Sequence, residues 1–119
     1  MAWYPSDIEK DNEFYSITNS SDISVPGSTW TKICTISTVN LKGKYFIQSG
    51  VSDAVNSKLY YCRICRNGNV DLTIVNIPYG TGNLYFLADI TEYDSIDFYL
   101  YGEAQTIAKY HAVLRLYKF

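Results

Sequence analysis

Two stretches near the C-terminus decide the fold: Ile96-Asp97-Phe98-Tyr99-Leu100-Tyr101 and Tyr110-His111-Ala112-Val113-Leu114-Arg115-Leu116-Tyr117-Lys118-Phe119. Each alternates with the two-residue period of a β-strand, which places successive side chains on opposite faces of a sheet. One face of each strand is largely aliphatic, and the other carries Tyr99, Tyr101, Tyr117 and Phe119. The aliphatic faces can form the core of a sandwich. The aromatic faces then require a second layer, a partner subunit or a ligand to cover them.

The rest of the chain indicates short strands separated by turns rich in Gly, Asn, Ser and Asp. The clearest unit joins Leu59–Arg66 to Val70–Ile77 through Asn67-Gly68-Asn69, because Asn-Gly is the strongest short-range signal for a hairpin. Further strands are expected at 14–18, 23–25, 30–37, 45–50 and 84–90. The strand at 30–37 alternates, but either of its faces could point inward. Residues 101–108 are expected to form a loop.

About eight to nine short strands, with no long helix and no repeat of fixed period, predict an all-β fold. We expect an antiparallel β-sandwich of the jelly-roll type. Residues 1–13, with Pro5 and an acidic mix, are interpreted as a tether or linker, and residues 14–119 as one head domain. A chain of 119 residues is long enough to bury a core without metal or disulfide support.

The composition argues against several classes of function. The net charge is -2 and no two Lys or Arg residues are adjacent, which disfavours binding to nucleic acid. No apolar run approaches the ~20 residues of a membrane span, so no membrane insertion is expected. Tyrosine is abundant, with 12 residues, and this residue suits half-buried sheets and interfaces.

Several motifs together resemble the C1q/TNF-like jelly roll found in the C-terminal heads of bacteriophage tail-fibre and baseplate receptor-binding proteins. They are Trp30-Thr31-Lys32-Ile33, Leu41-Lys42-Gly43-Lys44-Tyr45-Phe46-Ile47, Arg63-Ile64-Cys65-Arg66-Asn67-Gly68, Ile90–Tyr101 and Ala112–Phe119. The resemblance covers roughly residues 21–119. It implies ten short strands in two sheets, a homotrimer about a threefold axis, and attachment to a cell-surface receptor that is often a glycan. Residues 1–13 contain neither a collagen-like Gly-X-Y repeat nor a heptad pattern.

Cys34, Cys62, Cys65 and His111 include the residue types of a zinc site. However, residues three apart on a strand point to opposite faces and lie ~10 Å apart, so Cys62 and Cys65 cannot share a metal or form a disulfide. His111 has no serine or cysteine in a nucleophile motif to activate. We therefore expect buried thiols, no metal, no cofactor and no enzymatic activity.

Four acidic residues, Asp89, Glu92, Asp94 and Asp97, lie close together in the sequence. Paired carboxylates could hydrolyse a glycoside, and several could bind calcium. Because Asp89 and Asp97 fall within strands, only Glu92 and Asp94 share the loop. A solvated turn is the simpler interpretation.

Recognition residues are expected on loops that a rigid sandwich holds in place. The candidates for binding a receptor or glycan are Asp53, Asn56, Asn67, Asn69, Tyr79 and Asn83. Turn geometry by itself also favours Asn beside Gly, so these positions have a structural explanation as well.

The aromatic faces of the C-terminal strands are assigned to a trimer interface formed by Tyr99, Tyr101, Tyr117 and Phe119. Full burial of each such side chain contributes about 1.5–3 kcal/mol, which makes exposure of all four unfavourable. The first functional hypothesis is a homotrimeric head of a phage or phage-derived tail, located in the virion or on an extracellular surface, that binds a host cell-surface saccharide or protein. The second is a structural trimerisation module, and the third is a small glycan-cleaving enzyme.

Overall fold

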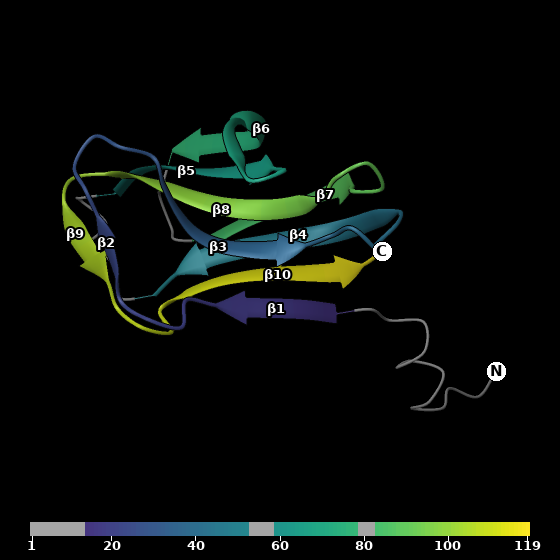
Figure 1. The fold of residues 1–119 in the computed structure, drawn as a ribbon, viewed down its shortest axis with the longest axis horizontal. Coiled ribbons are helices and arrows are strands. Elements are labelled where there is room, and N and C mark those ends of the chain that lie inside the picture. The colour runs from purple at the N-terminus through teal and green to yellow at the C-terminus, as the bar shows by residue number, and fades with distance from the viewer. Residues whose placement is uncertain (1–13, 53–58, 79–82) are drawn as a thin grey trace.

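The computed structural model describes residues 14–52, 59–78 and 83–119, which form ten β-strands (Figure 1). The strands are β1 (Phe14–Thr18), β2 (Ile23–Val25), β3 (Thr31–Ser37), β4 (Lys44–Val51), β5 (Leu59–Arg66), β6 (Asn69–Pro78), β7 (Asn83–Asp89), β8 (Ser95–Gly102), β9 (Gln105–Ile107) and β10 (Ala112–Lys118). Within these ranges, no helix has the length and hydrophobicity that crossing a membrane requires. The proposed tether at residues 1–13 lies outside them.

Two antiparallel sheets of four strands pack face to face, with the orders β1-β10-β4-β7 and β3-β8-β5-β6. The short ribbon formed by β2 and β9 lies at one end of this sandwich (Figure 1). The antiparallel β-sandwich predicted from the sequence is therefore confirmed.

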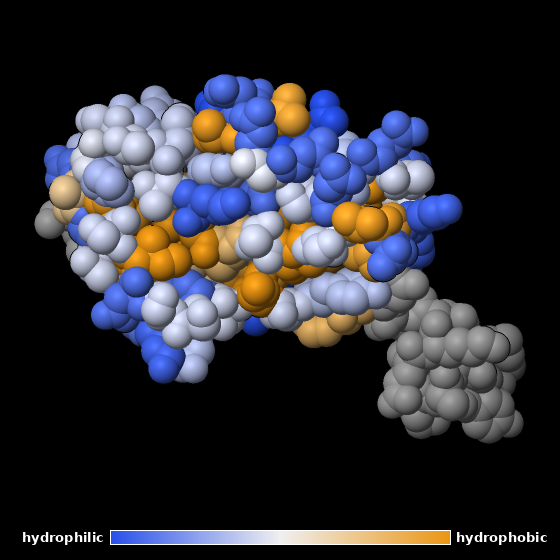
Figure 2. Space-filling model, in the orientation of Figure 1, coloured by the Kyte–Doolittle hydropathy of each residue, from blue (hydrophilic) through white to orange (hydrophobic). Residues whose placement is uncertain are grey.

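The core lies between the two sheets and contains the predicted aliphatic faces of β8 and β10. Ile96, Leu100, Leu114 and Leu116 are all 0% exposed. Figure 2 shows hydrophobic side chains along a band through the middle of the molecule, at the level of β3 and β10 in Figure 1. The other fully buried large side chains are Tyr45, Phe98, Ile47, Ile64, Ile90 and Val25.

A bulge in β3 explains why its inward face could not be chosen from the sequence. The pairing of β3 with β8 shifts between Lys32 and Cys34, so that Ile33 and Cys34 are both buried. A bulge adds one residue to a strand and reverses the alternation beyond it. Trp30 and Ile36, which simple alternation places on one face, consequently have different environments, because Ile36 is in the core and Trp30 is on the outer face.

The predicted hairpin between β5 and β6 is confirmed, and its turn has the geometry that Asn-Gly favours. Asn67 and Gly68 have φ angles of 59° and 69°. Arg66 pairs with Asn69, but Cys65 pairs with Thr73, so the three residues 70–72 bulge out of the ladder. The carbonyl of Val70 accepts hydrogen bonds from Cys65 Sγ and Arg63 Nη1 at 3.4 and 3.3 Å. The tip of the hairpin thus folds over the outer face of its own sheet.

The expectation of a loop at residues 101–108 was wrong at β9, which pairs with β2 through Ile23–Ile107, Ser24–Thr106 and Val25–Gln105. Three residues are too few for a two-residue period to be recognised. Ile107 is nevertheless 2% exposed, so this ribbon closes one end of the core. The last strand also begins later than predicted, at Ala112, because Tyr110 is in a turn with φ of 68°.

A buried carboxylate joins three segments of the β3-β8-β5-β6 sheet. Asp97, on the outer side of β8, is 0% exposed. Its oxygens accept hydrogen bonds from the Thr35 hydroxyl on β3, from the Ser95 hydroxyl at 3.1 and 3.2 Å, and from the Gly68 N–H of the hairpin turn at 2.8 Å. A buried carboxylate needs such donors to offset its loss of hydration.

We predict that Asp97→Ala destabilises the protein by about 1.5–3 kcal/mol, because hydrogen bonds to charged groups contribute that much and the Gly68 N–H loses its acceptor. Chemical denaturation measures the change. Asp94→Ala is the matched control, because this side chain is exposed in the adjacent turn, and we expect a change within about 0.5 kcal/mol. Equal stability of the two variants would contradict the role assigned to Asp97.

A second prediction concerns Ser49, which is 0% exposed on the inner face of β4 and whose hydroxyl has no hydrogen-bond partner among the described residues. Burying a hydroxyl without a partner is unfavourable by about 1–3 kcal/mol. Ser49→Ala removes the hydroxyl and leaves only a small void, so we expect unchanged or higher thermal stability. A fall in the melting temperature would show that the hydroxyl is satisfied in solution.

Candidate functional site

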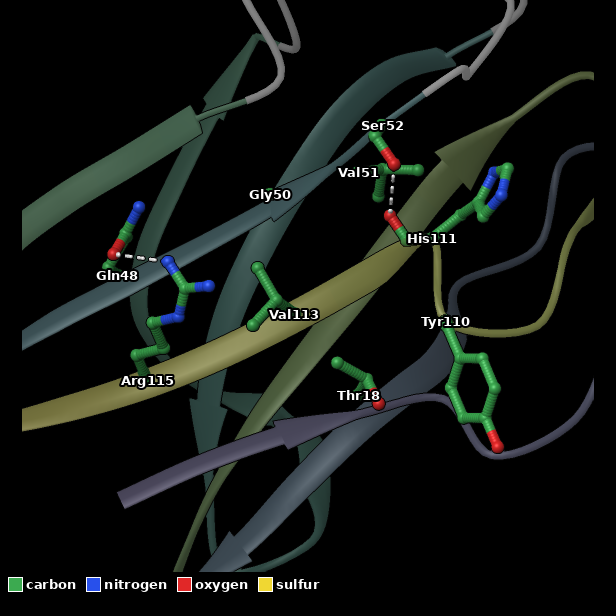
Figure 3. A pocket seen from close by; sticks show the side chains of 9 residues that line it. All are labelled: Thr18, Gln48, Gly50, Val51, Ser52, Tyr110, His111, Val113 and Arg115. Carbon is green, nitrogen blue, oxygen red and sulfur yellow. Dashed lines mark hydrogen bonds between the residues drawn. The ribbon is translucent and has the colours of Figure 1, made fainter. Parts of the chain in front are cut away.

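Each sheet has a hollow on its outer face, and the two hollows differ in chemistry. The larger, of about 500 Å³, lies over the β1-β10-β4-β7 sheet (Figure 3). Its lining residues are Thr18, Gln48, Gly50, Val51, Ser52, Tyr110, His111, Val113 and Arg115.

The polar groups of this larger hollow bond both to one another and to neighbouring residues such as Tyr85 and Tyr117. Arg115 Nη1 donates to Gln48 Oε1 at 3.4 Å, and the Ser52 N–H donates to the His111 carbonyl at 2.7 Å. Figure 3 shows the His111 imidazole pointing away from Arg115 and Gln48. Among the nine lining residues, the Ser52 hydroxyl donates to the backbone carbonyl of His111 at 3.3 Å rather than to its imidazole.

Beside this hollow, an apolar row crosses the same outer face. Phe14, Tyr117, Phe46 and Leu87 are opposed in register across β1, β10, β4 and β7, and Phe119 packs on Phe46 with ring centroids 5.8 Å apart. We call these five residues the aromatic row. Phe14, Phe46, Leu87 and Phe119 are 50%, 44%, 42% and 70% exposed. Single exposed apolar residues are common, but a contiguous row indicates an interaction surface.

The next two rows across this face contain one charged residue among the described side chains. Ser16, Arg115, Gln48 and Tyr85 are opposed in the first, and Thr18, Val113 and Gly50 in the second. The single charge is that of Arg115, which bonds to Gln48. The aromatic row therefore lies between these two rows and the oppositely charged pair Lys44 and Asp89, which are opposed in register on the same face.

The smaller hollow, of about 320 Å³, lies on the outer face of the β3-β8-β5-β6 sheet and is lined by Trp30, Tyr61, Arg63, Asn76 and Tyr101. We call it the Trp30 hollow. The Arg63 guanidinium carbon lies 4.1 Å from the centroid of the Trp30 ring. Tyr101 packs against Trp30 at 5.3 Å and against Tyr61 at 6.3 Å between ring centroids. Three aromatic rings, a cation and an amide thus surround one space.

The loop residues predicted to bind a receptor are not gathered into one site among the described residues. Asn67 and Asn69 lie at the tip of the hairpin, and their amide oxygens accept the N–H groups of Asp94 and Asp71 at 2.7 and 2.9 Å. Asn83 begins β7 in the opposite sheet. The other three candidates lie outside the described residues: Asp53, Asn56 and Tyr79.

The four aromatic residues assigned to a trimer interface lie on opposite outer faces of the sandwich. Tyr117 and Phe119 belong to the aromatic row, whereas Tyr101 lines the Trp30 hollow. Tyr99 is 7% exposed, and its hydroxyl donates to the Gly68 carbonyl at 3.3 Å. Burial also raises the pKa of Tyr99. Tyr99 therefore has little surface to offer a partner. An interface through the β1-β10-β4-β7 sheet stays a prediction for Tyr117 and Phe119, and it would not include Tyr101.

The acidic residues diverge in the fold. Asp89 ends β7 and accepts hydrogen bonds from the Thr91 hydroxyl and N–H at 2.7 and 3.0 Å, which lower the pKa of the Asp89 carboxyl. Asp97 belongs to the other sheet and bonds to Thr35, Ser95 and Gly68. In the part of the chain that the structure describes, no three His, Cys, Asp or Glu residues are grouped closely enough to hold a metal ion.

The three cysteines are free and buried. Cys34 and Cys62 belong to the core cluster between the sheets, whereas the thiol of Cys65 bonds to Val70 on the outer side. The expected opposite orientation of Cys62 and Cys65 is thus confirmed. Burial raises the pKa of each thiol to about 11.

The fold and its surfaces define the class of an all-β antiparallel sandwich with one exposed apolar face and one aromatic hollow. No family model matches the sequence, and no curated protein matches it.

We predict that the native thiols react slowly with a disulfide reagent such as dithiobisnitrobenzoate at pH 8. A pKa of about 11 instead of 9 lowers the thiolate fraction about 100-fold, and burial hinders access further. In urea, which unfolds the protein, all three thiols should react rapidly. Rapid labelling of any thiol in the native protein would contradict the burial described above.

The same pKa values predict how stability depends on pH. A thiol whose folded pKa is raised favours the folded state below the unfolded pKa near 9, and loses this contribution as the pH rises towards 11. The urea concentration at the midpoint of unfolding should fall between about pH 9 and pH 11. This fall should be smaller in a Cys62→Ala variant, which lacks one of the buried thiols.

Proposed function

We propose that this protein is a non-catalytic, homotrimeric attachment head, which binds a saccharide or protein on a host cell surface as part of a phage or phage-derived tail. The observation that carries the proposal is the exposed aromatic row on one outer face of the sandwich. The resemblance of its motifs to phage receptor-binding heads supplies the biological setting.

The order of the strands supports a jelly roll. Jelly rolls place eight strands in two sheets, joined by connections that cross between the sheets. In this chain β3 and β4 belong to different sheets, as do β4 and β5, β6 and β7, and β7 and β8. Only the β5–β6 hairpin joins neighbours within one sheet among these consecutive pairs. This alternation favours the jelly roll over a simple meander.

A second copy of the same chain is the occupant that best fits the aromatic row. Threefold assembly brings identical faces close together, so a face rich in one sign of charge would repel its copies. Among the described residues, this face carries Arg115, which bonds to Gln48, and the oppositely charged Lys44 and Asp89, which are opposed in register, so no single sign of charge dominates it. Burial of the row would contribute about 1.5–3 kcal/mol for each large apolar side chain that becomes fully covered.

Trimerisation through this sheet would leave the opposite outer face exposed to solvent. That face carries the Trp30 hollow, and an attachment protein needs such an accessible surface. The aromatic row taken alone also supports the second candidate function, a structural trimerisation module without a receptor.

We predict that the native protein has a mass of about 41 kDa in solution, three times the 13.6 kDa of one chain. Phe46→Asp places a charge in the centre of the aromatic row, so it should shift the mass towards that of one chain while the circular dichroism spectrum is retained. Multi-angle light scattering measures the mass of the native protein and of the variant. Val39→Asp is the matched control, because Val39 is 65% exposed in the turn between β3 and β4. A monomeric native protein would overturn the trimer proposal.

Binding of the trimer to a glycan array or to cultured host cells separates attachment from a structural role. A trimer that binds neither supports the structural module. Loss of array binding in Tyr79→Ala would place the receptor contact on the loop predicted from the sequence.

A further inference from the structure

We infer that the Trp30 hollow binds a sugar ring that carries a carboxylate, such as a hexuronic acid. This inference rests on the proposed function, because it names the class of ligand that the attachment head would recognise. The evidence comes from Arg63, from the rings around it and from the amide of Asn76.

The guanidinium of Arg63 is held in place but has no carboxylate partner among the described residues. It stacks on the Trp30 ring at 4.1 Å, and its Nη1 donates to the Val70 carbonyl at 3.3 Å. Its Nε is buried and has no hydrogen-bond partner in the described part of the chain. None of the five residues that line the hollow is acidic. A fixed positive charge beside an open space therefore favours an anionic ligand, and arginine matches the geometry of a carboxylate.

The aromatic residues indicate that the ligand is a ring rather than a small ion. Tyr61 is 44% exposed, and it meets Tyr101, which in turn contacts Trp30, so ring faces and edges form the walls of the hollow. A phosphate or a free carboxylate would gain nothing from such walls. The C–H groups of a sugar can pack on them, as ligand sites combine apolar walls with a few polar groups.

Asn76 supplies the remaining polar contact. It lies directly opposite Arg63 in the pairing of β5 with β6, and its side chain is exposed. An amide both donates and accepts hydrogen bonds, so it can pair with vicinal hydroxyls. The volume of about 320 Å³ is at the lower end of the range for small-molecule sites, which fits one sugar unit at a time.

Trp30 provides the readout for a test. The chain has two tryptophans, Trp3 and Trp30, so a Trp3→Phe background reports on Trp30 alone. We expect glucuronic acid to change the Trp30 fluorescence saturably in the millimolar range. Glucose should bind at least about tenfold more weakly, because charge-assisted hydrogen bonds to Arg63 are lost. Inorganic phosphate, which has the charge without the ring, should also bind at least about tenfold more weakly than glucuronic acid.

Substitutions then separate the contribution of the Arg63 charge from that of sugar packing on the aromatic rings. Arg63→Gln should weaken glucuronic acid at least about tenfold and leave the weak response to glucose unchanged, because only the charged contact is lost. Tyr61→Ala should weaken both sugars. Asn76→Ala, at an exposed position, tests the site without disturbing the Arg63 contacts and should weaken both sugars several-fold. Arg66→Gln is the matched control, because Arg66 stacks on Tyr93 at 5.3 Å outside the hollow, and it should change nothing.

The outcomes distinguish this inference from the proposed function. Equal affinity for phosphate and glucuronic acid would overturn the saccharide assignment in favour of a general anion site. A trimer that binds cells or an array but shows no response to glucuronic acid would overturn the inference and leave the attachment function standing. A Trp30 response that disappears in Arg63→Gln, from a protein that is monomeric, would overturn the trimeric head and support the hollow.

Discussion

The structure of the outer surface depends on the burial of one carboxylate. Asp97 is 0% exposed, and its oxygens are satisfied by donors from β3, from β8 itself and from the turn between β5 and β6. The Gly68 N–H reaches Asp97 only if the turn folds back over the sheet, and the bulge at residues 70–72 makes this possible. The folded-back tip then covers Cys65 and Tyr99 at one end of the outer face. The hollow remains at the other end.

The two outer faces of the sandwich consequently differ in how much of their surface is covered. The β3-β8-β5-β6 sheet covers part of its own outer face with its hairpin, so the space that remains is small and surrounded by rings. The β1-β10-β4-β7 sheet has no comparable cover within the described residues. Its aromatic row is exposed on β1, β4 and β7 and half-buried at Tyr117 on β10. A small lined hollow suits a small ligand, and a broad apolar face suits another protein surface. We therefore place recognition and assembly on opposite sides of the molecule.

Alternation along single strands was sufficient to predict the sandwich, because core side chains such as Ile96 and Leu114 repeat every second residue. The Asn67-Gly68 turn was equally readable, since a positive φ at both positions favours these residues. The Trp30 hollow, by contrast, could not be predicted from the sequence. A two-residue turn alone would pair Arg63 with Leu72, whereas the bulge at residues 70–72 and a second register shift at Ile74 together pair it with Asn76. Because residues from four separate segments meet there, no local pattern in the sequence marks the hollow.

The charges on this outer face also explain why Arg63 remains open to a ligand. Arg63 and Asp97 lie near each other on the same side of the sheet, because Arg63 is opposite Tyr99 and Cys65 is opposite Asp97 in the pairing of β5 with β8. The donors that the structure gives Asp97 are uncharged hydroxyl and N–H groups, and Arg63 donates to a neutral carbonyl. A direct ion pair would have neutralised Arg63 and offered a ligand only a weak field. By satisfying Asp97 with neutral donors, the hairpin turn leaves Arg63 without an ion pair, so that a carboxylate in the hollow can meet its charge.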